Sequence, residues 1–172
     1  MSSEDKNLSD VTAINIENMN DYSFGIIVSE WNEEITYALR DACIETLKEN
    51  GAYEENIHIT YVPGSFELPL GARIMMSREK IHAAICLGCV IKGETDHDKY
   101  INHAVAQGIM HLSLTSSKPV VFGVLTPNNK QQALDRAGGK YGNKGVEAAN
   151  TAIKMIIAAE KMNKIGRGIG FS

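Results

Sequence analysis

The chain lacks the features that mark exported and membrane proteins. It has three cysteines in 172 residues, and its first ten residues are polar where a signal peptide carries an apolar core. No apolar run approaches the roughly 18 residues that span a bilayer. We therefore expect a cytoplasmic protein with reduced thiols and no membrane partner.

A surplus of positive charge is also missing. Lysine and arginine number 17 against 21 aspartate and glutamate residues, which gives a formal net charge of -4. Proteins that bind nucleic acid normally carry a basic surface, so no nucleic-acid partner is expected. The hydrophobic fraction of 44% and the length predict one globular domain with its own core.

Four short apolar runs alternate with amphipathic stretches along the chain. The runs are too continuous for strands with one exposed face, and they cover residues 23–29, 57–62, 83–90 and 120–125. Helical periodicity covers residues 32–50, 68–78, 100–117, 130–137 and 146–162. Because parallel strands need helical crossovers, the pattern predicts an α/β protein, a three-layer αβα sandwich around a four-stranded parallel sheet.

The predicted domain covers residues 22–162. It is preceded by a polar N-terminal segment, residues 1–21, which we expect to dock on a neighbouring copy. It is followed by a flexible tail, residues 163–172, which is rich in glycine.

The segments after the four runs are the places to look for chemistry, because ligands of open α/β sheets bind beyond the carboxyl ends of the strands. The first, "SEWNEE", contains no glycine, which excludes the dinucleotide-binding fingerprint of a Rossmann fold. It holds the only tryptophan, Trp31. This ring either stacks on a planar heterocycle or caps the core, and the same alternatives hold for Phe66 after the second run.

Two titratable residues stand near predicted helix starts. Glu67 either accepts hydrogen bonds from the hydroxyl groups of a ligand or complements the dipole of its helix. His97 stands in the segment "GETDHD" after the third run. Its imidazole either moves protons near neutral pH or is a surface side chain without a role.

No metal site is expected. No two histidines have the i, i+4 spacing of metal-ligand pairs. Cys86 and Cys89 have CxxC spacing, but both lie in a predicted strand, where residues three apart point to opposite faces. We therefore dismiss a redox or zinc site at these cysteines.

The segment "DRAGGKYGNKG", residues 135–145, is the strongest candidate for binding an anion. Arg136, Lys140 and Lys144 are spread through a glycine-rich loop that leads into the last helix. Cationic side chains, free N–H groups and a helix N-terminus can converge there. Gly145 stands where a P-loop has Ser or Thr, so the loop is not a Walker motif. The alternative is a solvated basic turn.

Five blocks together resemble the lumazine synthase family: "VSEWN", "VPGSFELP", "GCVIKGETDHDKY", "VVFGVLT" and "RAGGKYGNKG". They follow in collinear order between about residues 24 and 161. The resemblance implies a flavodoxin-like sandwich and a step of riboflavin biosynthesis. In this step 5-amino-6-(D-ribitylamino)uracil condenses with 3,4-dihydroxy-2-butanone 4-phosphate to give 6,7-dimethyl-8-ribityllumazine, phosphate and water. It also implies no metal or organic cofactor, and riboflavin synthase as a candidate partner.

Two other functions fit the same fold. A non-catalytic flavin- or lumazine-binding protein would be expected to lose His97 or the basic loop, and this chain keeps both. A flavodoxin-type electron carrier would need a Ser/Thr-rich phosphate loop where this chain has "SEWNEE". We therefore expect an enzyme, a transferase.

The resemblance also implies roles residue by residue. Trp31 matches an aromatic residue that stacks on the pyrimidine, where many members have Phe, and Asn32 is its polar neighbour. His97 matches the proton-transfer residue, and Arg136 matches the main phosphate ligand. The segment that holds the ribityl chain is matched by Ser65, Phe66 and Glu67. The strand end that meets the pyrimidine through its backbone is matched by Cys89, Val90 and Ile91, and the turn on the phosphate side is matched by Glu94 and Thr95.

The resemblance finally implies an assembly. Family sites lie between neighbouring subunits of a pentamer, and some members stack twelve pentamers into an icosahedral shell. Phe122 matches an aromatic residue that enters the site of the adjacent subunit, with Lys144 nearby. The segment "GGKYGNKG" is short, as in shell-forming members, so we expect pentamers and favour the 60-subunit shell.

Overall fold

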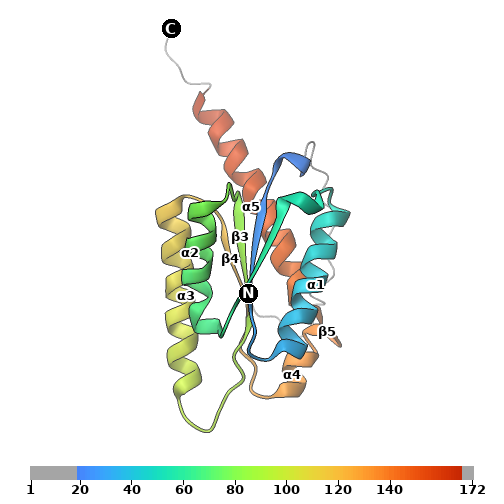
Figure 1. Ribbon diagram of the computed structural model, residues 1–172, viewed down its shortest axis with the longest axis vertical. Helices are drawn as coiled ribbons and strands as arrows, with labels where there is room; N and C mark the ends of the chain where they lie inside the picture. Colours follow the sequence, from blue (N-terminus) through green and yellow to red (C-terminus); the bar gives the residue numbers. More distant parts are fainter. Residues whose placement is uncertain (1–18, 168–172) are drawn as a thin grey trace.

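The computed structural model describes residues 19–167 (Figure 1). Its four-stranded sheet has the order β2-β1-β3-β4, with all neighbours parallel. The strands are β1 (Phe24–Ser29), β2 (Ile57–Val62), β3 (Ala83–Cys89) and β4 (Val120–Leu125). The predicted sheet is confirmed, and each predicted strand agrees with the observed one to within about one residue.

Helices cover both faces of this sheet (Figure 1). On one face α1 (Glu33–Glu49) packs against α5 (Lys144–Arg167). On the other face α2 (Leu68–Arg78) packs against α3 (His97–Ser116). The short helix α4 (Lys130–Leu134) follows β4, and three 3-10 turns complete the described part: η1 (Met19–Asp21), η2 (Glu54–Asn56) and η3 (Ser65–Glu67). The three-layer sandwich is therefore confirmed.

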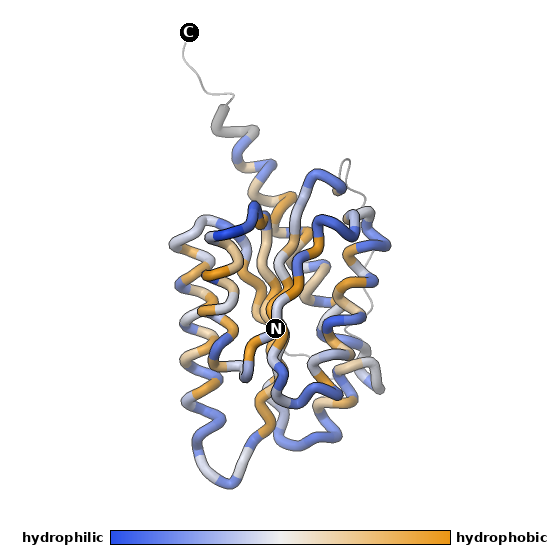
Figure 2. Tube along the Cα trace, viewed as in Figure 1, coloured by the Kyte–Doolittle hydropathy of each residue, from blue (hydrophilic) through white to orange (hydrophobic). Residues whose placement is uncertain are grey.

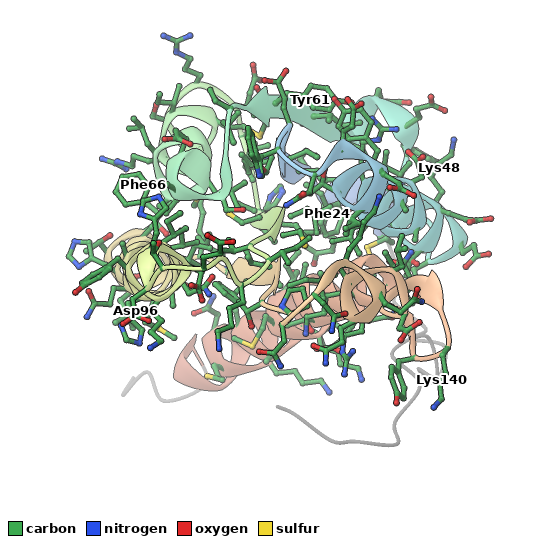
Figure 3. The ribbon with its side chains drawn as sticks, turned by 90° about the horizontal axis from the view of Figure 1, so that it is seen from below. Phe24, Lys48, Tyr61, Phe66, Asp96 and Lys140 are labelled. Carbon is green, nitrogen blue, oxygen red and sulfur yellow. The ribbon has the colours of Figure 1, made fainter. Side chains whose placement is uncertain are left out.

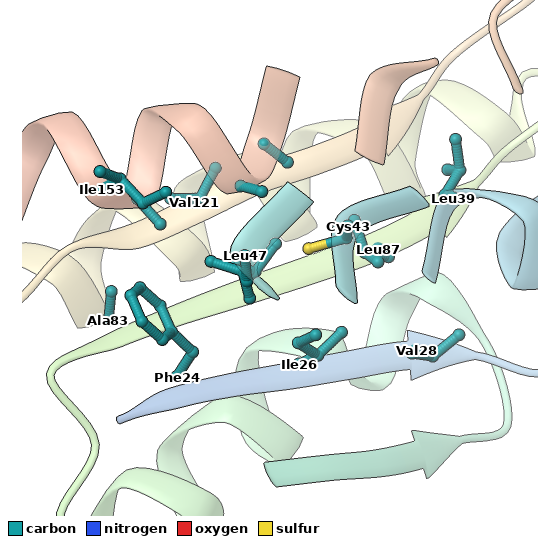
Figure 4. Packing of buried hydrophobic residues seen from close by; sticks show 14 of the residues in the cluster. Phe24, Ile26, Val28, Leu39, Cys43, Leu47, Ala83, Leu87, Val121 and Ile153 are labelled. Carbon is teal, nitrogen blue, oxygen red and sulfur yellow. The ribbon is translucent and has the colours of Figure 1, made fainter. Parts of the chain in front are cut away.

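Each face of the sheet buries its own apolar cluster. Phe24, Ile26 and Val28 of β1 face α1 and α5 (Figure 4), whereas Ile27 faces α2 and α3. This alternation follows from the two-residue period of a strand. The strands accordingly carry mostly hydrophobic residues, whereas hydrophobic and hydrophilic residues alternate along the helices (Figure 2).

The cysteines follow the same alternation. Cys86 lies in the cluster under α2 and α3, and Cys89 lies in the cluster under α1 and α5. Burial raises the pKa of each of these two thiols to about 12. The prediction that they point to opposite faces of the sheet is confirmed.

The start of α3 and the end of α4 differ from the predicted boundaries. Helix α3 begins at His97, about three residues early, because its first turn is polar and carries no apolar period. Helix α4 ends at Leu134, so the prediction of a helix to residue 137 is wrong. The chain then forms an antiparallel hairpin of β5 (Ala137–Gly139) and β6 (Gly142–Asn143) where a loop was predicted. Gly138 and Gly142 have φ of 110° and 80°, and only glycine adopts such values readily.

The hairpin leads directly into the contact between α5 and α1. A Cβ atom at Gly145 would lie 1.9 Å from the carbonyl oxygen of Leu39, so only glycine allows this close approach. The side chain of Asn143 accepts from the N–H of Gly145 at 2.8 Å and donates to the carbonyl oxygen of Ala38 at 3.1 Å. These contacts fix the hairpin on the α1 and α5 side of the sheet.

The predictions for the N-terminal segment and for the C-terminal tail can be compared with the structure only in part. Residues 1–18 of the N-terminal segment, predicted to dock on a neighbouring copy, lie outside the described residues, while Met19 is buried in the core. Helix α5 continues to Arg167, so the first part of the predicted tail is helical. Residues 168–172 lie outside the described residues. Within residues 19–167 no helix has the length and apolarity needed to cross a membrane.

Candidate active site

The carboxyl ends of the four strands meet at one edge of the sheet, which is at the bottom of Figure 1 and faces the viewer in Figure 3. The segments that carry the predicted site residues leave the sheet at this edge. Such an edge is where open α/β proteins bind ligands. The structure therefore places the candidate residues at an appropriate end of the fold.

The two aromatic residues near this edge are not part of the core. The side chain of Trp31 is 72% exposed and that of Phe66 is 59% exposed. The alternative that these rings cap the core is therefore wrong. Both leave aromatic surface open for a ligand or a second copy.

Asn32 ties together the ends of two strands. It has left-handed backbone angles (φ 63°, ψ 46°), which Asn tolerates better than most residues, and it precedes α1. Its side-chain amide donates a hydrogen bond to the carbonyl oxygen of Cys89 at 3.0 Å. Asn32 thereby fixes the start of α1 against the end of β3.

The backbone after β3 has unused hydrogen-bonding groups. The N–H of Val90 donates to Leu125 at 2.8 Å, and that of Lys92 donates to Pro127 at 3.0 Å. In a parallel ladder the intervening bond would run from residue 127 to the carbonyl oxygen of Val90, but proline has no N–H. Within residues 19–167, the Val90 carbonyl consequently has no partner. The Ile91 N–H points to the opposite side of the strand and has no partner in these residues either. Pro127 was not predicted as functional, although a proline just after a strand was a visible signal.

A buried hydroxyl lies in the turn after β2. Ser65 is 6% exposed, and its Oγ has no hydrogen-bond partner within the described residues. A Cβ atom at Gly88 of β3 would lie 2.6 Å from this Oγ, so glycine makes room for it. Glu67 stands at the N-cap of α2 but makes no capping hydrogen bond. Its half-buried carboxylate is available to a ligand.

His97 is the first residue of α3, and its exposed side chain makes no hydrogen bond within the described part of the chain. The preceding Asp96 is engaged elsewhere, in an ion pair of 2.7 Å with Lys99. Glu94 and Thr95 are exposed in the turn before the helix. Helix α3 packs on η3, which brings the histidine's helix to the segment of Ser65 and Glu67.

Two further acceptors on α3 were not predicted. Asp98 Oδ1 and Asn102 Oδ1 are buried and have no hydrogen-bond partner in residues 19–167. The two residues are four apart, so they lie on one face of the helix. A single sequence carries no signal for this, because a polar residue in the first helical turn is ordinarily exposed.

The three cations of the basic segment differ in their partners. Lys144 forms an ion pair of 2.6 Å with Glu147. Arg136 donates to the carbonyl oxygen of Gln132 at 3.1 Å, and it has no carboxylate within ion-pair distance among the described residues. Its positive charge is therefore available to an anion, in contrast to that of Lys144.

One chain does not bring all of these groups together. Figure 3 places Phe66 and Asp96 on the side covered by α2 and α3, and Lys140 on the opposite side. The hairpin that carries Lys140 contacts α1, α4 and α5. Phe122 lies half-buried on the edge strand β4, against the α2 and α3 cluster. Phe66 and Phe122 thus lie on the other side of the sheet from the hairpin that carries Lys140.

The described residues contain no group of three or more His, Cys, Asp or Glu side chains arranged to hold a metal ion. His82, for example, accepts a hydrogen bond from the backbone N–H of Ser23 at 2.9 Å, far from the carboxyl edge in the fold. The groups that the candidate site offers are aromatic faces, hydrogen-bonding groups, an imidazole and cations.

Comparison with known proteins identifies the family. The family model described as 6,7-dimethyl-8-ribityllumazine synthase matches residues 21–160. A protein of that name from Cytophaga hutchinsonii is 54% identical over 156 residues, which cover 91% of this chain and 98% of that one. The protein of that name from Bacteroides fragilis is 55% identical, and the match covers 82% of this chain and 99% of that one. The one from Flavobacterium psychrophilum is 46% identical, and the match covers 95% of this chain and 86% of that one. The chain therefore belongs to the 6,7-dimethyl-8-ribityllumazine synthase family.

Proposed function

We propose that the protein condenses 5-amino-6-(D-ribitylamino)uracil with 3,4-dihydroxy-2-butanone 4-phosphate to give 6,7-dimethyl-8-ribityllumazine, with release of phosphate and water. The observation that carries the proposal is the family match over nearly the whole described chain. The geometry supports it independently, because the carboxyl edge offers free groups for a flat polar ring, a polyol and a phosphate.

The pyrimidine substrate binds at the end of β3. Its ring stacks on Trp31, whose indole is 72% exposed. A uracil ring carries carbonyl acceptors at its edge, and one of them accepts from the unpaired N–H of Ile91, which points toward the β1 side of β3. The Val90 carbonyl belongs to the same trans peptide unit and points the other way, toward β4. Its ribityl hydroxyl groups donate to the unpaired Ser65 Oγ and to the carboxylate of Glu67.

The phosphorylated substrate binds between the turn before α3 and a basic hairpin. The backbone of Glu94 and Thr95 supplies N–H groups, and Arg136 supplies a bidentate cation. Lys144, paired with Glu147, contributes its charge less directly. Arg136 has no carboxylate partner among the described residues, so it attracts a dianionic phosphate.

His97 moves the proton that the condensation requires. The arylamine attacks the ketone, and the hydroxyl group of the resulting adduct leaves as water when the imidazole delivers a proton to it. The imidazole, neutral after giving up its proton, then accepts the proton from C3, and the electron pair left there expels phosphate from C4; Arg136 stabilises the departing anion. Attack of the ribitylamino nitrogen on C3, with loss of a second water, closes the ring. Holding the two substrates in a reactive geometry supplies a large part of the remaining acceleration.

The site is completed between copies of the chain. Within one copy, Phe66 and the hairpin that carries Lys140 lie on opposite sides of the sheet edge, so a neighbour supplies Arg136 and Lys144, which flank its hairpin. The family resemblance adds Phe122 from the edge strand β4 of that neighbour. A groove of about 500 Å³ between α2 and α3, with exposed Leu70, gives an apolar surface suited to such contacts. We infer pentamers as the unit and favour a 60-subunit shell. Light scattering and electron microscopy distinguish this shell from a free pentamer.

The cytoplasm is the compartment that suits this protein. Its three cysteines are free and buried. Both substrates are small and polar, and the proposed site uses no cofactor. Fractionation of cells that contain the protein tests this part of the proposal.

The reaction is tested by mixing the purified protein with the two substrates and following the absorbance of the lumazine product. Product formation at substoichiometric enzyme supports the proposal, and Arg136→Ala serves as the inactive control. If both substrates remain intact, the proposed reaction is wrong. Tight binding of lumazine or flavin without turnover would instead identify a non-catalytic binding protein.

A further inference from the structure

The Arg136 guanidinium lies over an aromatic ring. Its central carbon is 4.7 Å from the centroid of the Tyr141 ring, and Lys140 Nζ is 5.0 Å from the same centroid. Neither cation has a carboxylate within ion-pair distance among residues 19–167. Two cations without a carboxylate partner thus lie within cation–π distance of one tyrosine ring.

The local backbone fixes this arrangement. The N–H of Tyr141 donates to the carbonyl oxygen of Asp135 at 2.7 Å, which holds the tyrosine against the end of α4. The carboxylate of Asp135 accepts from the side chain of Gln131 at 2.9 Å, so it makes no ion pair with the neighbouring arginine. One nitrogen of Arg136 is anchored on Gln132, while the ring supports the rest of the guanidinium.

We propose that Tyr141 is a positioning residue for phosphate binding. Its ring holds the guanidinium of Arg136 in place for the phosphate group of the four-carbon substrate and sets Lys140 beside it as a second cation. The inference rests on the proposed function. An aromatic face attracts a cation without neutralising its charge, whereas the phosphate would have to displace a carboxylate partner. Ordering the side chain before binding also lowers the entropy lost on binding.

The test compares Tyr141→Leu, which removes the ring, with Tyr141→Phe, which keeps it. In the leucine variant, the KM for the phosphorylated substrate and the dissociation constant of inorganic phosphate should rise about three- to fivefold. The kcat at saturation and the KM for the pyrimidine substrate should stay within about twofold. The phenylalanine variant should match the wild type in all four quantities.

Tyr37→Leu is the matched control. Arg40 lies 4.5 Å over the Tyr37 ring on α1, and it also pairs with Asp41, so the same substitution removes a similar contact outside the proposed site. It should leave both phosphate constants unchanged. Tyr141→Met repeats the test without a branched side chain. If both of these Tyr141 variants unfold while Tyr141→Phe does not, the ring is a folding element and the inference is wrong.

Two further outcomes would overturn the inference. One is an unchanged phosphate constant in a folded Tyr141→Leu. The other is a phenylalanine variant as weak as the leucine variant, since the hydroxyl group and not the ring face would then matter. Calorimetric titration with inorganic phosphate separates this test from the reaction itself. A wild type without product contradicts the proposed function, whereas the phosphate constants still decide the role of Tyr141.

Discussion

The two ends of the sheet differ in whether their polar groups have hydrogen-bond or ion-pair partners. At the amino end, the hydroxyl of Tyr22 donates to Glu160, and the N–H of Ser23 donates to His82 at 2.9 Å. Burial and Glu160 raise the pKa of this tyrosine to about 12. At the carboxyl end the Oγ of Ser65 is buried without a partner, and Arg136 has no carboxylate within the described residues.

This difference distinguishes a structural end from a functional one. A buried polar atom without a partner costs about 1 to 3 kcal/mol, so a fold keeps such atoms mainly where something else satisfies them. In residues 19–167 the unpaired buried side-chain atoms belong to Ser65, Asp98 and Asn102, in the segments that follow β2 and β3. This distribution supports our proposal that the site lies at the carboxyl end, because a bound substrate would satisfy these atoms.

The largest expected effect is the loss of the arginine at the carboxyl end. Arg136→Ala should lower kcat/KM for the phosphorylated substrate about 10³-fold, because nothing else on the hairpin offers a bidentate cation. Steady-state kinetics with each substrate varied in turn measure this. Arg40→Ala, which removes an arginine already paired with Asp41, is the control and should leave kcat/KM within about twofold. Equal losses in the two variants would contradict the assigned role.

The next effect concerns proton transfer. His97→Ala should lower kcat about 10²-fold while both KM values change only a few-fold, since the imidazole acts on the reacting hydroxyl more than on binding. Presteady-state mixing of enzyme with both substrates shows which step slows. His103→Ala removes another exposed imidazole from the same helix and should have little effect. A normal kcat for His97→Ala would exclude this proton donor.

Substitution of Trp31, at the same end, should affect substrate affinity but not the stability of the fold. Trp31→Ala should weaken binding of the pyrimidine substrate about tenfold, since stacking on a base contributes about 1 to 3 kcal/mol. The melting temperature should hardly change, because the side chain is 72% exposed. Trp31 is the only tryptophan, so its fluorescence should be quenched when the wild type binds this substrate. A lower melting temperature with unchanged affinity would return Trp31 to a structural role.

The sequence predicted the frame of the fold well and its connections less well. Buried parallel strands are continuous apolar runs, which is why β1 to β4 were placed almost to the residue. The hairpin at Gly138 and Gly142 was predicted as a loop, because positive φ angles and a two-residue strand have no periodic signal. The first turn of α3 was missed since its residues are all polar.

The candidate site shows the same limit. The resemblance named Trp31 and Asn32, but their settings depend on contacts far apart in the chain, such as the hydrogen bond from Asn32 to Cys89. The free carbonyl of Val90 follows from Pro127, two residues beyond the end of the neighbouring strand β4, and only the sheet register reveals this. A periodic pattern reports which face of an element is buried, and it carries no information on which strand lies next to which.

The smallest effect is expected at the amino end, on stability alone. Burial, with Lys80 and Lys118 nearby, lowers the pKa of His82, and Glu160 opposes this only in part. The folded chain thus favours the neutral imidazole, whose Nδ1 accepts from Ser23. This contribution to stability is present above the ordinary histidine pKa of about 6.5 and is lost as the pH falls below it.

His82→Leu removes that acceptor and should cost about 1 kcal/mol of the free energy of unfolding at pH 7.5 and less at acidic pH. His82→Asn keeps an acceptor that does not titrate, so its stability should fall less than that of the wild type between pH 7 and about 5. Denaturant unfolding at both pH values measures this, with kcat/KM at neutral pH as the control. Activity should not change, because the proposed site lies at the other end of the sheet. A loss of activity that exceeds the loss of stability would show that the two ends of the sheet are coupled, and the division between a structural and a functional end would then be wrong.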